Sequence, residues 1–144
     1  MRVYLDNCCY NRPFDDQAQL KVRLETEAKL FVQGLMRNGA VEYVWSDMLA
    51  NEVEESKFWE RKMRIVPWAV GASVYVVTTP EIEKLAEVFM GVGVKASDAI
   101  HLASAKHAEC DWFLTVDGGI LKKVNRIENM RVANPLEFIQ EVNP

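Results

Sequence analysis

The amino-acid sequence predicts an α/β fold, a three-layer α/β/α sandwich built on a central, mainly parallel sheet. Apolar runs of four or five residues alternate along the chain with longer segments of helical periodicity. The short runs are apolar on both faces, which is typical of strands that helices cover on both sides. The 144 residues are 49% hydrophobic and 26% charged, as in an ordinary globular domain. We therefore expect residues 1–144 to form a single domain.

The first half of the chain contains two predicted strands and three predicted helices. An apolar run that ends at Asp6 predicts the first strand, and apolar residues at spacings of three and four predict a long helix that stops at Asn38. Ser46 is a typical helix N-cap, and Pro67 follows the third helix. The predicted elements are a strand at Arg2–Leu5, a helix at Asp15–Arg37 with Leu20, Leu24, Ala28, Phe31 and Leu35 as its apolar positions, a strand at Val41–Trp45, a helix from Ser46 through Glu52 toward Lys57, and a helix at Phe58–Val66.

The second half repeats the alternation of strand and helix. Thr79-Pro80-Glu81 is typical of a helix start, because proline early in a helix gives up no hydrogen bond. Gly91 and Gly93 close that helix. The predicted elements are a strand at Val74–Val77, the helix from Thr79 to Gly91, a helix at Ser97–Glu109, a strand at Trp112–Val116, a short helix at Gly118–Val124, a strand at Met130–Ala133 and a terminal helix at Pro135–Val142.

Composition excludes several classes of protein. No segment reaches the roughly 18 uncharged apolar residues of a membrane span, and the apolar run after Arg2 is too short for a signal peptide. We therefore expect a cytoplasmic protein. The odd number of cysteines, Cys8, Cys9 and Cys110, predicts reduced thiols. The formal charge of −4 argues against phosphate binding by a surplus of lysine and arginine.

Two aspartates stand at the carboxyl ends of predicted strands. Asp6 follows the first strand and Asp117 follows the strand at Trp112–Val116, whereas Asp111 precedes that strand and is interpreted as a solvated loop acid. Ligands gather outside the carboxyl ends of the strands in an open parallel sheet. Either aspartate alone is equally well explained as a turn or helix-cap residue. Together they predict a site at this edge of the sheet.

Two further acids lie on the packing faces of predicted helices. At 100° per residue, Asp98 lies within about 40° of Leu102 and Ala105. An ionised carboxylate on such a face needs a cation, a hydrogen-bond cage or a metal. The alternative is that Asp98 only favours the N-terminus of its helix electrostatically. On the helix that begins at Ser46, Glu52 lies on the apolar face, but periodicity does not decide between Glu52 and Glu55.

Carboxylates that converge at one sheet edge repel each other, and no lysine or arginine in their motifs is placed to neutralise them. A divalent cation would do so, and oxygen-only ligands favour Mg²⁺ or Mn²⁺. Zinc is disfavoured, because His101 and His107 are six residues apart on one helix and therefore lie on different faces of it. Both histidines are assigned surface or packing roles. A thiol nucleophile at Cys8-Cys9 is disfavoured because no histidine lies nearby in sequence.

Four stretches of the chain resemble, in order, the successive motifs of PIN domains. They are VYLDN, SDMLANEVEE, ASDAIHLASAKHAECDWFLTVDGGILKK and RVANPLEFI, of which the third is the most specific. The resemblance implies that Asp6, Glu52, Asp98 and Asp117 are metal-site acids, which selects Glu52 over Glu55. It also implies a ribonuclease whose products carry a 5′-phosphate and a 3′-hydroxyl. Many relatives are similar to the VapC group of toxins, which implies an antitoxin partner and a homodimer.

Two positions depart from the family pattern. Many PIN domains carry serine or threonine after the first aspartate, and some carry a further acid beyond the last, where this chain has Asn7 and Gly118-Gly119. We expect Asn7, and Thr115 on the strand face of Asp117, to support the site as hydrogen-bond donors. With one fewer anionic ligand, we expect one firmly bound ion and a second that binds only with the substrate phosphate.

Basic and aromatic residues indicate how RNA or a partner would be bound. A metal ion reverses the local charge of the site acids, so the net charge of −4 does not exclude RNA. Contacts to the RNA backbone are expected from Arg12, Lys122, Lys123 and Arg126, with a solvated surface role as the alternative. Phe58–Trp68 interleaves basic and large apolar residues. Core packing, an antitoxin or dimer surface, and RNA stacking are all compatible with that pattern.

Rival functions make different demands on the residues after the first strand. A phospho-receiver domain has a pair of acids there, and a haloacid-dehalogenase phosphatase has two aspartates two residues apart. Asp6-Asn7-Cys8 fits neither. The remaining alternative is a catalytically weak PIN-like module that binds protein or RNA.

Overall fold

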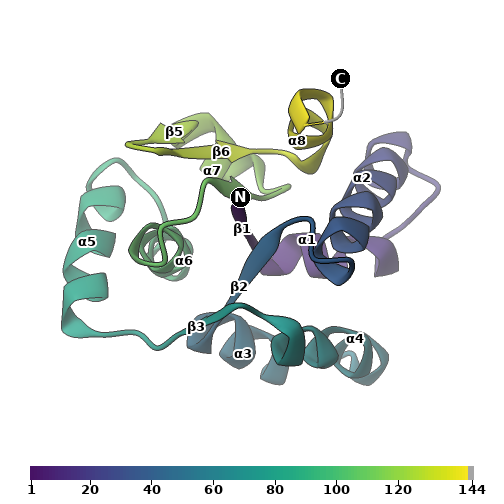
Figure 1. Ribbon diagram of the computed structural model, residues 1–144, viewed down its shortest axis with the longest axis horizontal. Coiled ribbons are helices and arrows are strands. Elements are labelled where there is room, and N and C mark those ends of the chain that lie inside the picture. The colour runs from purple at the N-terminus through teal and green to yellow at the C-terminus, as the bar shows by residue number, and fades with distance from the viewer. Residues whose placement is uncertain (143–144) are drawn as a thin grey trace.

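A central sheet with helices on both faces forms the three layers of the molecule, as the computed structural model shows for residues 1–142 (Figure 1). The predicted α/β/α sandwich is therefore confirmed. The strands follow the order β3-β2-β1-β4-β6-β5, all parallel to their neighbours except β5, which runs antiparallel to β6. They are β1 (Arg2–Leu5), β2 (Glu42–Ser46), β3 (Val74–Val76), β4 (Trp112–Leu114), β5 (Arg126–Ile127) and β6 (Met130–Ala133).

The helices connect the parallel strands. In Figure 1, α5 and α6 lie on one side of the sheet and α1 and α2 on the other. The helices are α1 (Asn7–Asn11), α2 (Leu20–Arg37), α3 (Asp47–Glu54), α4 (Trp59–Ile65), α5 (Pro80–Gly91), α6 (Ala96–His107), α7 (Gly118–Lys123) and α8 (Pro135–Val142), with 3₁₀ turns η1 (Arg12–Phe14) and η2 (Val66–Gly71). None of the helices in residues 1–142 has the length and apolarity needed to cross a membrane.

Side-chain caps start the helices where the sequence predicts. The Ser46 hydroxyl accepts a hydrogen bond from the backbone N–H of Leu49 and so caps α3, and the Thr79 side chain accepts one from Ile82 at the start of α5. Each cap satisfies one of the backbone donors that a helix N-terminus leaves free, a contribution of about 1 kcal/mol.

The central strand β1 is buried beyond its first residue. Val3, Tyr4 and Leu5 have no exposed surface, and the Tyr4 ring stacks on Phe113 of β4 at 5.2 Å between centroids. The register pairs Leu5 with Leu114. The residues that follow these two strands therefore emerge side by side at the same edge of the sheet.

The long helix α2 begins later and packs differently from its apolar pattern. Of its predicted apolar positions, Leu20, Leu24 and Phe31 are exposed. Glu25 and Lys29 are buried instead. Glu25 is buried because its carboxylate accepts hydrogen bonds from the guanidinium of Arg12 and the side-chain amide of Asn134, which lie on the inner side of the helix. The residues before Leu20 form η1 and the turn that follows it, so the helix begins at Leu20 and not at Asp15.

The stretch Phe58–Trp68 is partly exposed. Phe58 is 59% exposed, Trp59 69% and Met63 55%, so a core role is wrong for these three side chains. Ile65 is buried, and the Trp68 ring packs edge-on against Tyr43. The helix α4 therefore points its first aromatic residues away from the core and anchors itself through its last turn.

Candidate metal centre

Asp6 is fixed by hydrogen bonds where β1 ends. One carboxylate oxygen accepts from the backbone N–H of Asn7 at 2.8 Å, and the other accepts from the hydroxyl of Thr115 at 2.8 Å and the thiol of Cys8 at 3.3 Å. The side chain caps α1, and Asp6 is only 5% exposed. A buried carboxylate that accepts three hydrogen bonds is held in one orientation.

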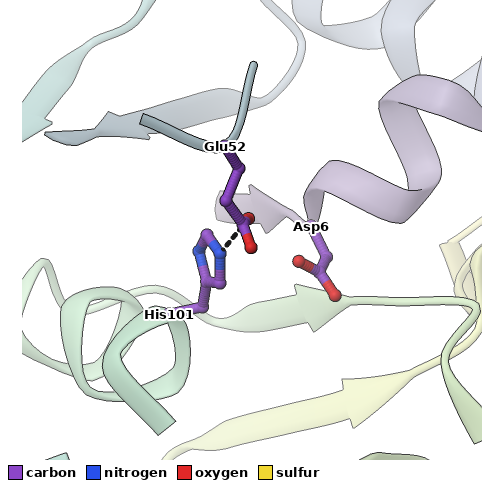
Figure 2. Close-up of side chains that lie close together, drawn as sticks. All are labelled: Asp6, Glu52 and His101. Atoms are coloured by element: carbon purple, nitrogen blue, oxygen red, sulfur yellow. Dashed lines mark hydrogen bonds and ion pairs between the residues drawn. The ribbon is translucent and has the colours of Figure 1, made fainter. Parts of the chain in front are cut away.

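Glu52 reaches the same edge from α3 and meets His101 of α6. The Oε1 atom of Glu52 lies 2.5 Å from Nε2 of His101, whose ring has no exposed surface. Figure 2 shows these two side chains pointing toward each other, with the Asp6 carboxylate beside them. One ligand atom each from Asp6, Glu52 and His101 lies within 4.8 Å of the others, so the three side chains form a compact group. Glu55 is exposed, so the geometry favours Glu52.

Asp98 and Asp117 lie outside the group formed by Asp6, Glu52 and His101 and line a cavity of their own. Asp98 lies in the first turn of α6, and Asp117 caps α7 by accepting from the backbone N–H of Gly119 at 2.7 Å. Both line a cavity of about 90 Å³ together with Lys95 and Lys123. In residues 1–142 neither aspartate forms an ion pair with these lysines, and the Lys123 amine donates to a backbone carbonyl instead.

The pKa of Asp98 is raised by burial and by the neighbouring acids. Burial raises the pKa of Asp98 to about 6, and the negative charges of Asp6, Asp117 and Glu52 contribute, against a smaller lowering by His101. A half-buried carboxylate that faces like charges is destabilised when ionised, and a bound cation would relieve it. Asp98 and the acids around it therefore fit a divalent ion, as the prediction of a metal site built from four acids requires.

His101 is the residue that the sequence reasoning missed. The prediction placed it in a surface or packing role; its ring is buried, but it also contacts Glu52 at the site, whereas His107 is exposed. The available signal was the spacing of three residues from Asp98, which places both on one helix face. Burial lowers the pKa of His101, but the hydrogen bond to Glu52 and the charges of Asp6, Glu52 and Asp98 outweigh it, so the pKa is raised.

Of the two predicted supporting residues, Thr115 acts on Asp6 through its side chain and Asn7 only through its backbone. Thr115 is fully buried and uses its hydroxyl proton on the Asp6 carboxylate, while its oxygen accepts from the backbone N–H of Asp117 at 3.1 Å. It thus joins the two strand-end aspartates. Asn7 contributes its backbone N–H to Asp6. The thiol of Cys8 is no nucleophile, because its hydrogen bond with Cys9, its burial and the charge of Asp6 hold its pKa well above the usual value.

The basic residues expected to contact RNA differ in what they touch. Arg12 forms ion pairs with Asp15 and with the fully buried Glu25, so its guanidinium is engaged within the fold. Lys122, Lys123 and Arg126 are exposed on α7 and β5, just after Asp117. These three stay candidates for contact with the phosphate backbone, and Arg12 is better explained as a structural residue.

A mainly parallel sheet whose carboxyl edge gathers acidic side chains between α3, α6 and α7 defines a PIN-like α/β/α fold. No protein-family model matches the chain, and no curated protein matches it.

Solved structures share this fold. A chain of FitAcB from Neisseria gonorrhoeae matches with a TM-score of 0.59 at 16% identity, over 93% of this chain and 98% of that one. A chain of VapBC2 from Rickettsia felis bound to a DNA fragment from their promoter matches with a TM-score of 0.57 at 12% identity, over 93% of this chain and 98% of that one. A chain of DNA-bound VapBC from Salmonella typhimurium matches with a TM-score of 0.53 at 15% identity, over 94% of this chain and 98% of that one. The predicted resemblance to VapC-like PIN domains is thus confirmed as a likeness of fold.

Proposed function

We propose that this chain is a metal-dependent ribonuclease that hydrolyses phosphodiester bonds in RNA. The supporting observations are that Asp6 and Glu52 bring ligand atoms within 4.8 Å of each other at the carboxyl edge of the sheet, that Asp98 and Asp117 line one cavity, and that the charges of the other three acids help raise the pKa of Asp98 to about 6. No lysine or arginine in residues 1–142 forms an ion pair with any of these acids. Glu52 has His101 as its partner, but Asp6, Asp98 and Asp117 have no basic partner among these residues, and buried charges are usually paired or bind a metal.

In the proposed reaction, the ion supplies the chemistry and the residues of the chain hold it in place. Bound Mg²⁺ or Mn²⁺ would activate the attacking water and offset the negative charge that builds on the phosphate. Asp6, Glu52, Asp98 and Asp117 would hold the ion through their carboxylate oxygens. Thr115 keeps Asp6 in place, and the exposed amine of Lys95 stands at the rim of the cavity where the phosphate would lie.

We also propose an antitoxin-like protein partner, which docks on the exposed apolar side chains of the α4 surface. This surface consists of Phe14, Phe58, Trp59 and Met63. A hollow of about 600 Å³ is lined by three of these residues with Lys57, Glu60 and Arg61. The Arg61 guanidinium lies 4.5 Å from the centroid of the Phe58 ring. Exposed aromatic residues beside an arginine are the composition of protein-binding hot spots.

A homodimer and a cytoplasmic location complete the proposal. The exposed apolar residues of α2, Leu20, Leu24 and Phe31, are a second surface on which a copy of the chain could pack. The three cysteines form no disulfide within residues 1–142, as a reducing compartment requires. Light scattering of the purified chain measures the dimer directly.

Cleavage of single-stranded RNA with Mg²⁺ or Mn²⁺ tests the proposed activity. We expect products with a 5′-phosphate and a 3′-hydroxyl, and no products once EDTA is present. Products with a 2′,3′-cyclic phosphate would contradict the metal-assisted reaction, because they arise when the ribose hydroxyl attacks. Absence of cleavage, together with retained binding of RNA or of a protein partner, would favour the alternative of a catalytically weak PIN-like binding module.

A further inference from the structure

An unbroken line of hydrogen bonds runs from the core of the sheet to Glu52. The Ser46 hydroxyl lies 2.7 Å from the Tyr4 hydroxyl, which lies 2.5 Å from Nδ1 of His101, and Nε2 of His101 lies 2.5 Å from Oε1 of Glu52. Ser46, Tyr4 and His101 have no exposed surface. The line joins β2, β1, α6 and α3, which are the elements that meet at the site.

When the imidazole of His101 is neutral, the donors and acceptors in this line allow one placement of the protons. Ionised Glu52 only accepts, so Nε2 of His101 carries the proton and donates it. Nδ1 then has only a lone pair and accepts from the Tyr4 hydroxyl. The Tyr4 oxygen in turn accepts from Ser46, whose own oxygen accepts from the backbone N–H of Leu49. Every buried polar atom in the line is then satisfied.

The same line fixes how Glu52 presents its carboxylate. The side chain of Glu52 is 27% exposed, and in residues 1–142 His101 is its hydrogen-bond partner through Oε1. The second oxygen, Oε2, is left for an ion at the site. Ser46 adds to this control, because the hydroxyl that begins the line also caps the helix that carries Glu52.

A direct role of His101 as a metal ligand conflicts with these distances. Two ligand atoms on neighbouring positions of an octahedral Mg²⁺ or Mn²⁺ site, each about 2.1 Å from the ion, are about 3 Å apart. Nε2 and Oε1 are 2.5 Å apart, as in a charge-assisted hydrogen bond. Nδ1 is occupied by Tyr4 on the side of the core.

We propose that His101 is a positioning residue, which is held by Tyr4 and orients Glu52 for metal binding without touching the ion. This inference rests on the proposed metal-dependent function. Partners of this kind, one step removed from the metal, typically contribute 10- to 100-fold to metal affinity or activity. The mechanism would be the same as for Asp6, which Thr115 and the Asn7 backbone hold in place.

Mn²⁺ affinity of the full chain, measured by calorimetry, tests the role. His101→Asn can accept from Tyr4, but its amide is too short to reach Glu52, and we expect a loss of about 10- to 100-fold. His101→Gln places an amide donor where Nε2 stands, and we expect affinity within about threefold of wild type. His107→Gln on the same helix is the matched control, and we expect it to change nothing. Equal affinities for His101→Asn and wild type would overturn the proposal.

Two further measurements separate positioning from ligation. If His101 acts through Glu52, the double variant Glu52→Gln with His101→Asn binds Mn²⁺ no more weakly than Glu52→Gln alone. Additive losses would overturn the proposal, and so would pulsed-EPR couplings of a directly bound imidazole nitrogen in the wild-type Mn²⁺ complex. Wild-type protein that binds no Mn²⁺ would remove the proposed function together with this inference. Wild-type binding with an unaffected His101→Asn variant would remove the inference alone.

Discussion

Replacing Asp98 by asparagine should have opposite effects on the stability of the metal-free protein and on its response to Mn²⁺. The substitution removes a negative charge that faces Asp6, Glu52 and Asp117 but keeps the shape of the side chain. Without metal, the repulsion between that charge and the neighbouring acids destabilises the fold. With metal, it is a ligand. A residue that merely caps the start of α6 would show neither pattern.

The size of the metal-free effect follows from the pKa of Asp98. A rise from 3.8 to about 6 corresponds to about 3 kcal/mol at about 1.4 kcal/mol per pKa unit. Because the carboxyl group is only half-buried, solvent screening reduces this to about 1 to 1.5 kcal/mol. The native state binds more protons than the unfolded state between pH 3.8 and about 6. Wild-type stability therefore contains a favourable contribution below this window that is lost as the pH rises through it.

Thermal unfolding at pH 8 with and without Mn²⁺ measures both effects. We expect metal-free Asp98→Asn to melt about 3 to 5 °C above wild type. Mn²⁺ at 100 times its dissociation constant should stabilise wild type by about 2.7 kcal/mol and leave the variant nearly unchanged. An Asp98→Asn protein that melts below metal-free wild type, or that keeps the full Mn²⁺ response, would refute the electrostatic reasoning. Asp111→Asn, at the opposite end of β4, is the matched control.

Three further predictions concern residues outside the metal centre. Arg12→Ala leaves the carboxylate of Glu25 buried without its cation and should lower the free energy of unfolding by about 3 kcal/mol in urea titrations. Burial lowers the pKa of Lys29 to about 8, so wild-type stability should rise between pH 8 and about 10, and Lys29→Met should gain up to about 3 kcal/mol at pH 7. Phe58→Ala with Trp59→Ala should weaken capture of a protein partner at least tenfold, measured by surface plasmon resonance, and leave the melting temperature within about 2 °C, because both side chains are exposed.

Exposed positions on the same elements supply the controls. Arg23→Ala and Lys21→Met lie on the solvent side of α2 and should change stability by less than about 0.5 kcal/mol. If Arg12→Ala is as stable as Arg23→Ala, the ion pair with Glu25 does not support the fold. A Lys29→Met protein that is less stable than wild type at pH 7 would show that the lysine amine is well solvated. Partner binding that survives the double aromatic variant would move the docking surface elsewhere.

Much of the fold could be predicted because its strands are short, apolar and punctuated. The run before Asp6 and the N-caps Ser46 and Thr79 mark element boundaries that the structure reproduces to within one residue. The burial of α2 could not be predicted from its apolar stripe. Its buried face depends on Arg12 and Asn134, which come from elsewhere in the chain and satisfy Glu25. Hydrogen bonds between distant residues leave no periodic trace in a sequence.

The candidate site was predictable in part for a related reason. Strand ends placed Asp6 and Asp117, and the helix face placed Asp98, because these are local properties of strand and helix. Choosing Glu52 over Glu55 needed the family resemblance, since helical periodicity allows both. The contact between His101 and Glu52 depends on how α3 and α6 pack across β1, which is a tertiary property.

The rate of RNA cleavage by wild type, Asp98→Asn and Asp111→Asn, with Mn²⁺ and with EDTA, tests the central claim most directly. We expect Mn²⁺-dependent cleavage by wild type and Asp111→Asn at equal rates. Asp98→Asn should be slower by at least a hundredfold, and EDTA should abolish all activity. Cleavage that survives EDTA, or an Asp98→Asn variant as active as Asp111→Asn, would contradict a metal-dependent ribonuclease built on these acids.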